Sequence, residues 1–181
     1  GDRLVLGKPV GVGVLSAALK KDQLGAEGYA QMIANTTQLN TPGPDLAALD
    51  GVHALTDITG FGLAGHAMEM ARGADTTVRI DFSRVPLLPG VRELAAAGVV
   101  TGASGRNWAA FGHEVQLAPT LQGPDQALLS DPQTSGGLLV ACAPEAVAEV
   151  LAVFQRHGFA GATEIGEIVP AQADGVRLRV D

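Results

Sequence analysis

The 181-residue sequence has a single cysteine, no charged-then-apolar leader and no long apolar run. One cysteine cannot form a disulfide within the chain, so a reducing cytoplasmic compartment is expected. No apolar run reaches the ~20 residues that a membrane-spanning helix needs. The sequence therefore predicts a cytoplasmic globular protein with no membrane partner.

Clustered basic residues are also scarce, because the net charge is −7 and the longest basic run is Lys20-Lys21. Proteins that bind nucleic acid neutralise its phosphates with lysine and arginine. A nucleic-acid partner is therefore not expected. Any phosphate that this acidic chain binds needs a metal ion or cations from outside.

The apolar content of 46% is enough for a sizeable core, and the length predicts one domain. Residues 1–50 are predicted to form a strand followed by a helical arm. The chain begins close to strand material without a start methionine, which predicts a piece of a longer protein.

Hydrophobic periodicity predicts alternating strands and helices. Strands are expected at Leu4–Leu6, Val52–Leu55, Thr77–Phe82, Glu114–Leu117, Leu138–Ala143, Glu164–Val169 and Val176–Val180, the last two as a closing pair. Helices are expected around Val14–Leu19, at Ala26–Leu39 with Tyr29, Met32, Ile33 and Thr36 buried, at Asp45–Leu49, Phe61–Ala71 and Gly90–Ala97, and from Pro144 to His157. Gly98–Leu121 is predicted to be a long ordered loop except for its short strand.

The stretch TDITGFGLAGH, residues 56–66, joins a predicted strand to a predicted helix. Its glycines leave the backbone bare, so the helix start can offer N–H groups to an anion with the helix dipole behind them. The stretch therefore predicts a phosphate site. Its candidate nucleotide- or phosphate-binding residues are Thr56, Thr59, Gly60 and Gly62.

Asp57 lies at the carboxyl end of the predicted strand and has two interpretations. It can cap the helix, a common use of aspartate. It can also hold a divalent cation, because Mg²⁺ in proteins is usually bound by one or two carboxylates together with substrate phosphates. Thr59 is better placed to cap the helix, which leaves Asp57 without a structural role and makes it the candidate metal ligand.

Gly60 to Gly65 also match G-x-G-x-x-G, and Asp81 follows about 20 residues later, as in a dinucleotide-binding unit. A bare Asp57 carboxylate ~4 Å from a pyrophosphate would cost on the order of 4 kcal/mol at an effective dielectric constant near 20. A cation between the carboxylate and the phosphate makes this interaction energy favourable. A metal-bridged nucleotide such as Mg·ATP therefore fits this stretch better than a dinucleotide.

A second polar loop, SDPQTSGG at residues 130–137, precedes the most apolar strand. Its first four residues have the pattern of a helix N-terminus. Thr134, Ser135 and Gly136, with Asn107 from the glycine-rich region, are candidate substrate-loop residues. The alternative is a structural one, a capped turn that positions the strand and an asparagine that anchors its own loop.

Cys142 and His66 are assigned structural roles. Cys142 lies within an apolar run and is expected to be an inert buried thiol. His66 is expected to be a hydrogen-bonding residue of the first helix after the junction, and the four histidines have no metal-ligand spacing. No catalytic residue is predicted within this chain.

TDITGFGLAGH and SDPQTSGGLL, with GDRLVLGKPVGVGVLSAALKK, Leu88–Gly90, Arg106-Asn107 and IGEIVP in the same order, resemble selenophosphate synthetase of the aminoimidazole-ribonucleotide-synthetase-like superfamily. The resemblance covers essentially all 181 residues. It implies an α/β fold, a layered structure with a mixed β-sheet flanked by helices, which agrees with the element order above.

The resemblance further implies that residues 1–181 are the single C-terminal domain of a two-domain enzyme. Such enzymes make selenophosphate, AMP and phosphate from selenide, ATP and water with Mg²⁺, and they pair as homodimers. The reactive cysteine or selenocysteine and most metal-binding aspartates would lie in the N-terminal domain outside this chain. Asp57 is the one ligand carried over, and the isolated chain is expected to be inactive.

Two other functions stay open at this point. One is a related superfamily synthetase that acts on a carboxamide or amidine substrate. The other is a non-enzymatic dinucleotide-binding module, which rests only on the glycine spacing and Asp81.

Overall fold

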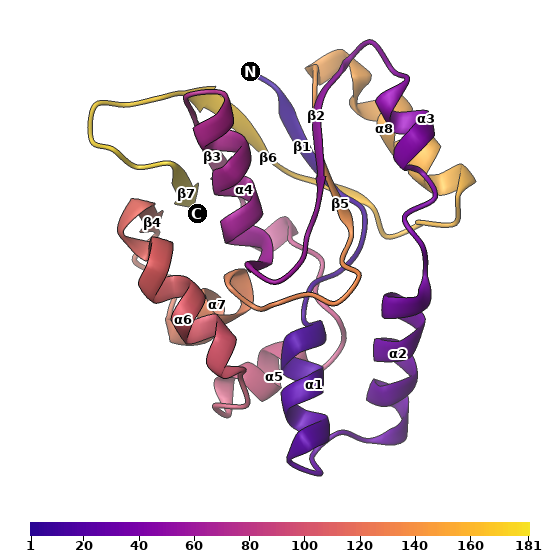
Figure 1. The fold of residues 1–181 in the computed structure, drawn as a ribbon, viewed down its shortest axis with the longest axis vertical. Helices are drawn as coiled ribbons and strands as arrows, with labels where there is room; N and C mark the ends of the chain where they lie inside the picture. Colours follow the sequence, from indigo (N-terminus) through magenta and orange to yellow (C-terminus); the bar gives the residue numbers. More distant parts are fainter.

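The computed structural model describes residues 1–181 as a seven-stranded sheet with helices on both faces (Figure 1). The strands are β1 (Arg3–Leu6), β2 (Val52–Asp57), β3 (Thr76–Ile80), β4 (Val115–Leu117), β5 (Leu138–Cys142), β6 (Thr163–Pro170) and β7 (Leu178–Val180). The α-helices are α1 (Val12–Lys20), α2 (Ala26–Thr37), α3 (Gly43–Ala47), α4 (Gly62–Gly73), α5 (Val91–Ala96), α6 (Gly102–Phe111), α7 (Gly123–Leu129) and α8 (Val147–Arg156). Short 3₁₀ turns lie at Phe82–Arg84, Gly112–Glu114 and Pro144–Ala146.

The strand order is β2-β5-β1-β6-β3-β7-β4, and the sheet is mixed. The first five strands pair antiparallel, whereas β7 pairs parallel with both β3 and β4. β2 lies at one edge, so its last residue, Asp57, reaches the end of an edge strand. The expected mixed sheet flanked by helices is confirmed.

Two hydrophobic cores lie on opposite faces of the sheet. On the inner face, α4 and its neighbours cover side chains such as Leu4, Val78 and Leu139. On the outer face, α8 covers Val5 and Val140. β5 is buried along its whole length because both cores use it, as its unbroken apolar sequence predicted.

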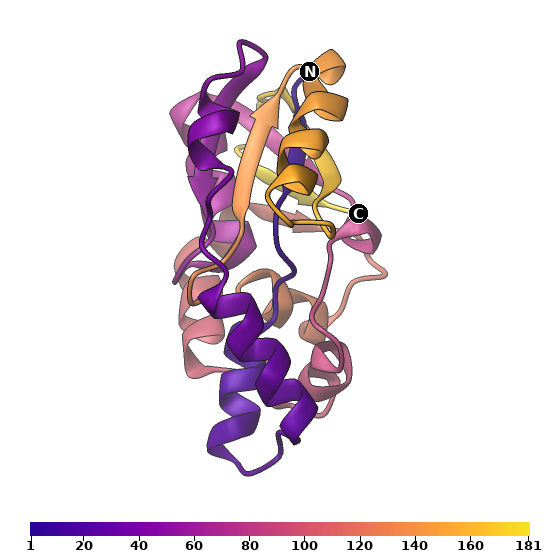
Figure 2. The ribbon, with the colours of Figure 1, turned by 90° about the vertical axis from the view of Figure 1, so that its right-hand side faces the viewer.

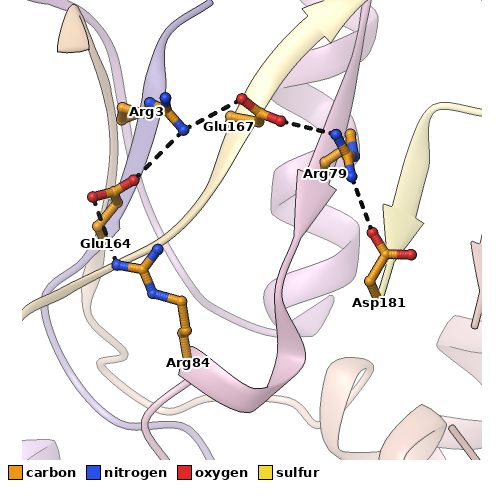
Figure 3. A network of polar contacts seen from close by, with 6 residues as sticks. All are labelled: Arg3, Arg79, Arg84, Glu164, Glu167 and Asp181. Carbon is orange, nitrogen blue, oxygen red and sulfur yellow. Dashed lines mark hydrogen bonds and ion pairs between the residues drawn. The ribbon is translucent and has the colours of Figure 1, made fainter. Parts of the chain in front are cut away.

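The outer face beyond α8 is polar and carries an ion-pair network (Figure 3). Arg3 from β1 lies 3.8 Å from Glu164 and 3.3 Å from Glu167, both from β6. Arg79 of β3 reaches Glu167 at 3.0 Å and Asp181 at 3.4 Å. The arginine side chains of these pairs are more than two-fifths exposed, so each ion pair adds little to folding stability. The network gives this part of the sheet a polar, solvent-exposed face.

α1 and α2 form the predicted arm, which projects beyond the lower end of the sheet (Figure 2). In α2 only Met32 and Asn35 are buried. The predicted burial of Tyr29 and Ile33 is wrong, because they are 48% and 41% exposed. Met32 lies on the buried side of α2, whereas Tyr29 and Ile33 lie on its exposed side.

Two further sequence predictions are wrong. Gly98–Leu121 is not one long loop, because it contains the ten-residue helix α6, whose first turn Thr101 caps by accepting from the Ser104 N–H. The last two strands, β6 and β7, do not pair with each other. β3 lies between them, antiparallel to β6 and parallel to β7.

No helix combines the length and the apolar character needed to cross a membrane.

Candidate phosphate site

The junction between β2 and α4 contains an exposed carboxylate and free backbone donors. Asp57 is exposed, and its carboxylate accepts no hydrogen bond within the chain. The backbone N–H groups of residues 59–61 donate no hydrogen bond, and no side chain caps α4. These groups are the donors that a helix N-terminus leaves available to an anion.

Thr59 does not cap α4 with its hydroxyl as predicted. Its Oγ1 lies 3.0 Å from His66 Nε2, and His66 Nδ1 lies 2.8 Å from Glu69 Oε2. The side chain of His66 is buried, so it prefers these two partners to water. His66 is therefore a structural hydrogen-bonding residue, as expected, and its ring contacts the Thr59 hydroxyl, which does not cap α4.

The 130–137 loop lies directly against this junction. The Ile58 N–H donates to the Gly137 carbonyl at 2.9 Å, and the Gln133 N–H donates to the Thr59 carbonyl at 2.9 Å. Gly62, at φ +72°, packs so closely that an added Cβ would lie 2.7 Å from the Ser130 carbonyl carbon. The two polar loops of the sequence therefore form one rigid unit.

The four candidate substrate-loop residues occupy different environments. Thr134 is exposed, whereas the Ser135 carbonyl accepts from Lys8 Nζ at 2.7 Å. Gly136 is buried against the Ile58 carbonyl, which leaves no space for a Cβ. Asn107 Nδ2 donates to the Gly60 carbonyl at 2.8 Å and to the Ser130 carbonyl at 3.1 Å. The hydroxyls of Thr134 and Ser135 have no hydrogen-bond partner within the chain, whereas Asn107 and Gly136 hold backbone segments in place.

All four candidate phosphate-binding residues lie next to Asp57 at the junction between β2 and α4. Thr59 and Gly60 lie in the turn that precedes α4, and Gly62 begins the helix. Thr56 is the half-buried penultimate residue of β2, and its hydroxyl makes only a 3.5 Å contact with the Asp57 carbonyl.

The predicted helix start at Ser130–Gln133 is wrong, because these residues are not helical. The side chains of Asp131 and Gln133 instead accept hydrogen bonds from the N-terminus of α1. Asp131 Oδ2 accepts from the N–H groups of Gly13 and Val14 at 2.9 and 3.3 Å. Gln133 Oε1 accepts from those of Gly11 and Val12 at 3.1 and 3.2 Å. The sequence pattern correctly indicated side chains that cap a helix, but the helix they cap is α1, which is distant in the sequence.

Asp131 is fully buried, and its Oδ1 has no hydrogen-bond partner. Burial raises the pKa of this carboxyl to about 7, although hydrogen bonds from Gln133, Val14 and Gly13 oppose the shift. The desolvation of a buried charge is therefore the larger effect.

Lys8 is the main residue that sequence reasoning missed. Its side chain is almost completely buried, and Nζ donates to the carbonyls of Asn35, Gln38 and Ser135 at 3.1, 2.6 and 2.7 Å. Burial lowers its pKa. It ties the C-terminal end of α2 to the 130–137 loop, and a lysine before Pro9 carries no periodic signal that would reveal this role.

Cys142 is buried in β5, as expected. Burial raises the pKa of its thiol to about 11, with smaller contributions from the negative charges of Asp2 and Glu164. A thiol that stays protonated is a poor nucleophile.

The dinucleotide interpretation is wrong. In a dinucleotide-binding unit the first two strands are neighbours, so the acidic residue after the second strand faces the glycine loop. Here three strands separate β2 from β3. Asp81 instead accepts from the Ser83 N–H and hydroxyl at 3.0 and 2.6 Å and caps a 3₁₀ turn.

A complete metal site is not present, since no group of three His, Cys, Asp or Glu residues is arranged to hold an ion. Asp57 can contribute one ligand only. One carboxylate completed by phosphate oxygens and water is nevertheless a common arrangement for Mg²⁺. The donor set therefore fits a metal that arrives with a phosphate and has further ligands from outside this chain.

Comparison with known proteins agrees with this architecture. Residues 1–179 match the family model for the AIR synthase related protein, C-terminal domain. The chain is 67% identical over 173 residues to a selenide, water dikinase from Burkholderia pseudomallei, covering 96% of this chain and 49% of that protein. The chain thus spans about half the length of the curated relatives it matches.

Solved structures share the fold at low sequence identity. E. coli HypE has a TM-score of 0.68 at 23% identity, over 99% of this chain and 46% of HypE. Thiamine-monophosphate kinase from Stenotrophomonas maltophilia has a TM-score of 0.66 at 16% identity, over 100% of this chain and 50% of that kinase. With the family model matching almost every residue, the chain belongs to the AIR synthase related proteins, as their C-terminal domain.

Proposed function

We propose that this chain is the C-terminal domain of an ATP-dependent enzyme that makes selenophosphate, AMP and phosphate from selenide, ATP and water. The 67% identity to a selenide, water dikinase about twice as long supports this function. The proposal includes an N-terminal domain outside this chain, a homodimeric full-length enzyme and a cytoplasmic location.

The observation that carries the proposal is the free Asp57 carboxylate beside the unpaired N–H groups of residues 59–61. Backbone donors at a helix N-terminus attract a phosphate, whereas a bare carboxylate repels it. A divalent cation between the two makes both contacts favourable. Asp57 is therefore proposed as one Mg²⁺ ligand, with Thr56, Thr59, Gly60 and Gly62 around the ATP phosphates.

In this mechanism the chain contributes binding and orientation. When bound, Mg²⁺ supplies charge neutralisation and a fixed geometry for the phosphates. The backbone donors would orient the phosphate chain, and Asp57 would hold the ion that accompanies it. A single carboxylate cannot align a triphosphate for in-line transfer, so the isolated chain is proposed to be inactive.

Asp57→Asn in the full-length enzyme tests this role. The amide keeps the size of the side chain but is a much weaker Mg²⁺ ligand, so turnover should fall by about a hundredfold at limiting Mg²⁺. Stability should change little, because the Asp57 carboxylate has no partner to lose. Selenophosphate formation is measured across a Mg²⁺ titration, with thermal melts of both proteins.

Asp50→Asn is the matched control, because Asp50 is exposed and lies just before the opposite end of β2. It removes the same charge far from the junction and should leave turnover unchanged. Wild-type turnover of Asp57→Asn at limiting Mg²⁺ would refute the metal role.

A further inference from the structure

Asn107 is buried on α6, and both acceptors of its amide belong to the two loops of the candidate site. Nδ2 donates to the Gly60 carbonyl at 2.8 Å and to the Ser130 carbonyl at 3.1 Å. Two carbonyl oxygens can be satisfied together only by a group with two N–H donors, which an asparagine amide provides. The side chain is 9% exposed and its donors are used, so it has little left to offer a substrate.

The bond to Gly60 controls the direction of a free donor. The Gly60 carbonyl and the Phe61 N–H belong to one planar peptide unit, and in a trans peptide they point in opposite directions. The chain contains no cis peptide. An amide that holds the Gly60 oxygen toward α6 therefore turns the Phe61 N–H the other way, and that N–H has no partner in the chain.

The bond to Ser130 ties the same side chain to the neighbouring loop. Gly62 begins α4 against the Ser130 carbonyl carbon with no room for a Cβ. The Gln133 N–H donates to the Thr59 carbonyl from the same loop. Asn107 thus connects the two segments whose contact sets where α4 starts.

We infer that Asn107 is a positioning residue that fixes the Gly60–Phe61 peptide, and with it the phosphate-facing N-terminus of α4. This inference rests on the proposed function of that terminus. Without the amide, the peptide can rotate, and only a fraction of molecules present the Phe61 N–H to a phosphate. Apparent affinity falls in proportion to that fraction.

Asn107→Asp tests the inference, because it keeps the size of the side chain and removes both donors. In the full-length enzyme, the KM for Mg·ATP should rise about tenfold while kcat changes by less than about twofold. In this chain, hydrogen exchange of the Gly62 and Gln133 amides should become faster, because both donate to the Thr59 carbonyl in the turn that the Asn107 amide holds through Gly60. Asn107→Ala, which adds no charge, is the second variant if the aspartate prevents folding.

Asn40→Asp is the matched control. Asn40 Nδ2 donates to the Gly136 carbonyl at 2.9 Å, so the same chemical change removes an anchor of the 130–137 loop without touching Gly60. It should leave the KM for Mg·ATP within about twofold of wild type. A comparable rise in the KM for Mg·ATP in Asn107→Asp and Asn40→Asp would mean that Asn107 only stabilises the loops in general, and it would overturn the inference.

The remaining outcomes separate this inference from the proposed function. An unchanged KM in both Asn107 variants overturns the positioning role, whether or not exchange becomes faster. If Asp57→Asn also leaves turnover intact, the phosphate site itself is wrong. If Asp57→Asn abolishes turnover while the Asn107 variants keep their KM, the proposed function stands and only the positioning role fails.

Discussion

The N-termini of α1 and α4 both contact the 130–137 loop, but only that of α1 is closed, meaning that its backbone N–H groups all have acceptors within the chain. At α1, Asp131 and Gln133 accept from all four N–H groups of residues 11–14. At α4, only Gly62 donates, to the Thr59 carbonyl, and the N–H groups of residues 59–61 have no partner. A buried helix end must be satisfied from within the chain, whereas an accessible one can be kept for an external anion.

The largest effect is expected from Gly62→Ala, which would disturb the open terminus. A residue with a Cβ is strained at φ +72°, and the Cβ would lie 2.7 Å from the Ser130 carbonyl carbon. Strain and overpacking together should cost about 4 kcal/mol of folding stability. Chemical denaturation measures the loss.

Gly60→Ala is the control for that change. An added Cβ at Gly60 meets nothing within 4 Å, so stability should change by less than about 0.5 kcal/mol. Equal losses in the two variants would mean that the close contact between the loops does not define the start of α4.

Asp131→Asn tests whether the closed terminus depends on pH. Burial raises the pKa of Asp131 from 3.8 to about 7 in the folded chain. Between these values the unfolded chain releases the proton and the folded chain keeps it, so this group's contribution to stability falls as pH rises. Wild type should therefore lose roughly 3 kcal/mol relative to Asp131→Asn between pH 4 and pH 7.

Denaturant titrations of both proteins at several pH values measure this difference. Parallel stability curves across the range would contradict it and would indicate that Asp131 is already ionised at pH 4. In that case the hydrogen bonds from Gly13 and Val14, and not burial, would control the charge.

Among the changes expected to alter folding stability, Gln133→Ala should have the smallest effect. It removes the acceptor for the Gly11 and Val12 N–H groups, a loss comparable to deleting a helix cap, and should cost about 2 kcal/mol. Hydrogen exchange of those two amides should become faster. Unchanged protection would mean that Asp131 alone holds the terminus of α1.

Local sequence patterns predicted the elements whose partners lie nearby. The apolar run of β5 and the periodic apolar residues of α8 match the structure. A strand that is buried on both faces is apolar at every position, whereas a helix that is buried on one face is apolar at every third or fourth position. The strand–glycine–helix pattern around Asp57 was equally clear. The candidate phosphate residues were therefore identified from sequence, although their function stays a prediction.

Features that depend on distant partners could not be predicted. Nothing local in the sequence indicates that Asp131 and Gln133 cap α1, that Lys8 is buried, or that Asn107 joins two loops. α6 was missed because Gly102 and Gly105 weaken its helical pattern. In each case a tertiary contact, and not the local sequence, decides the structure.

The position of β1 within the sheet has a consequence for the order of folding. Its Arg3 pairs with Cys142 on one side and with Glu167 on the other, so the first of the seven strands in this sheet is held between the fifth and the sixth along the chain. Contacts between such distant parts of a chain form slowly, because a long loop must close first. During synthesis, residues 3–6 cannot pair within this sheet until β5 has left the ribosome, and a chain truncated before Thr163 would leave the β6 side of β1 as an open edge that favours aggregation.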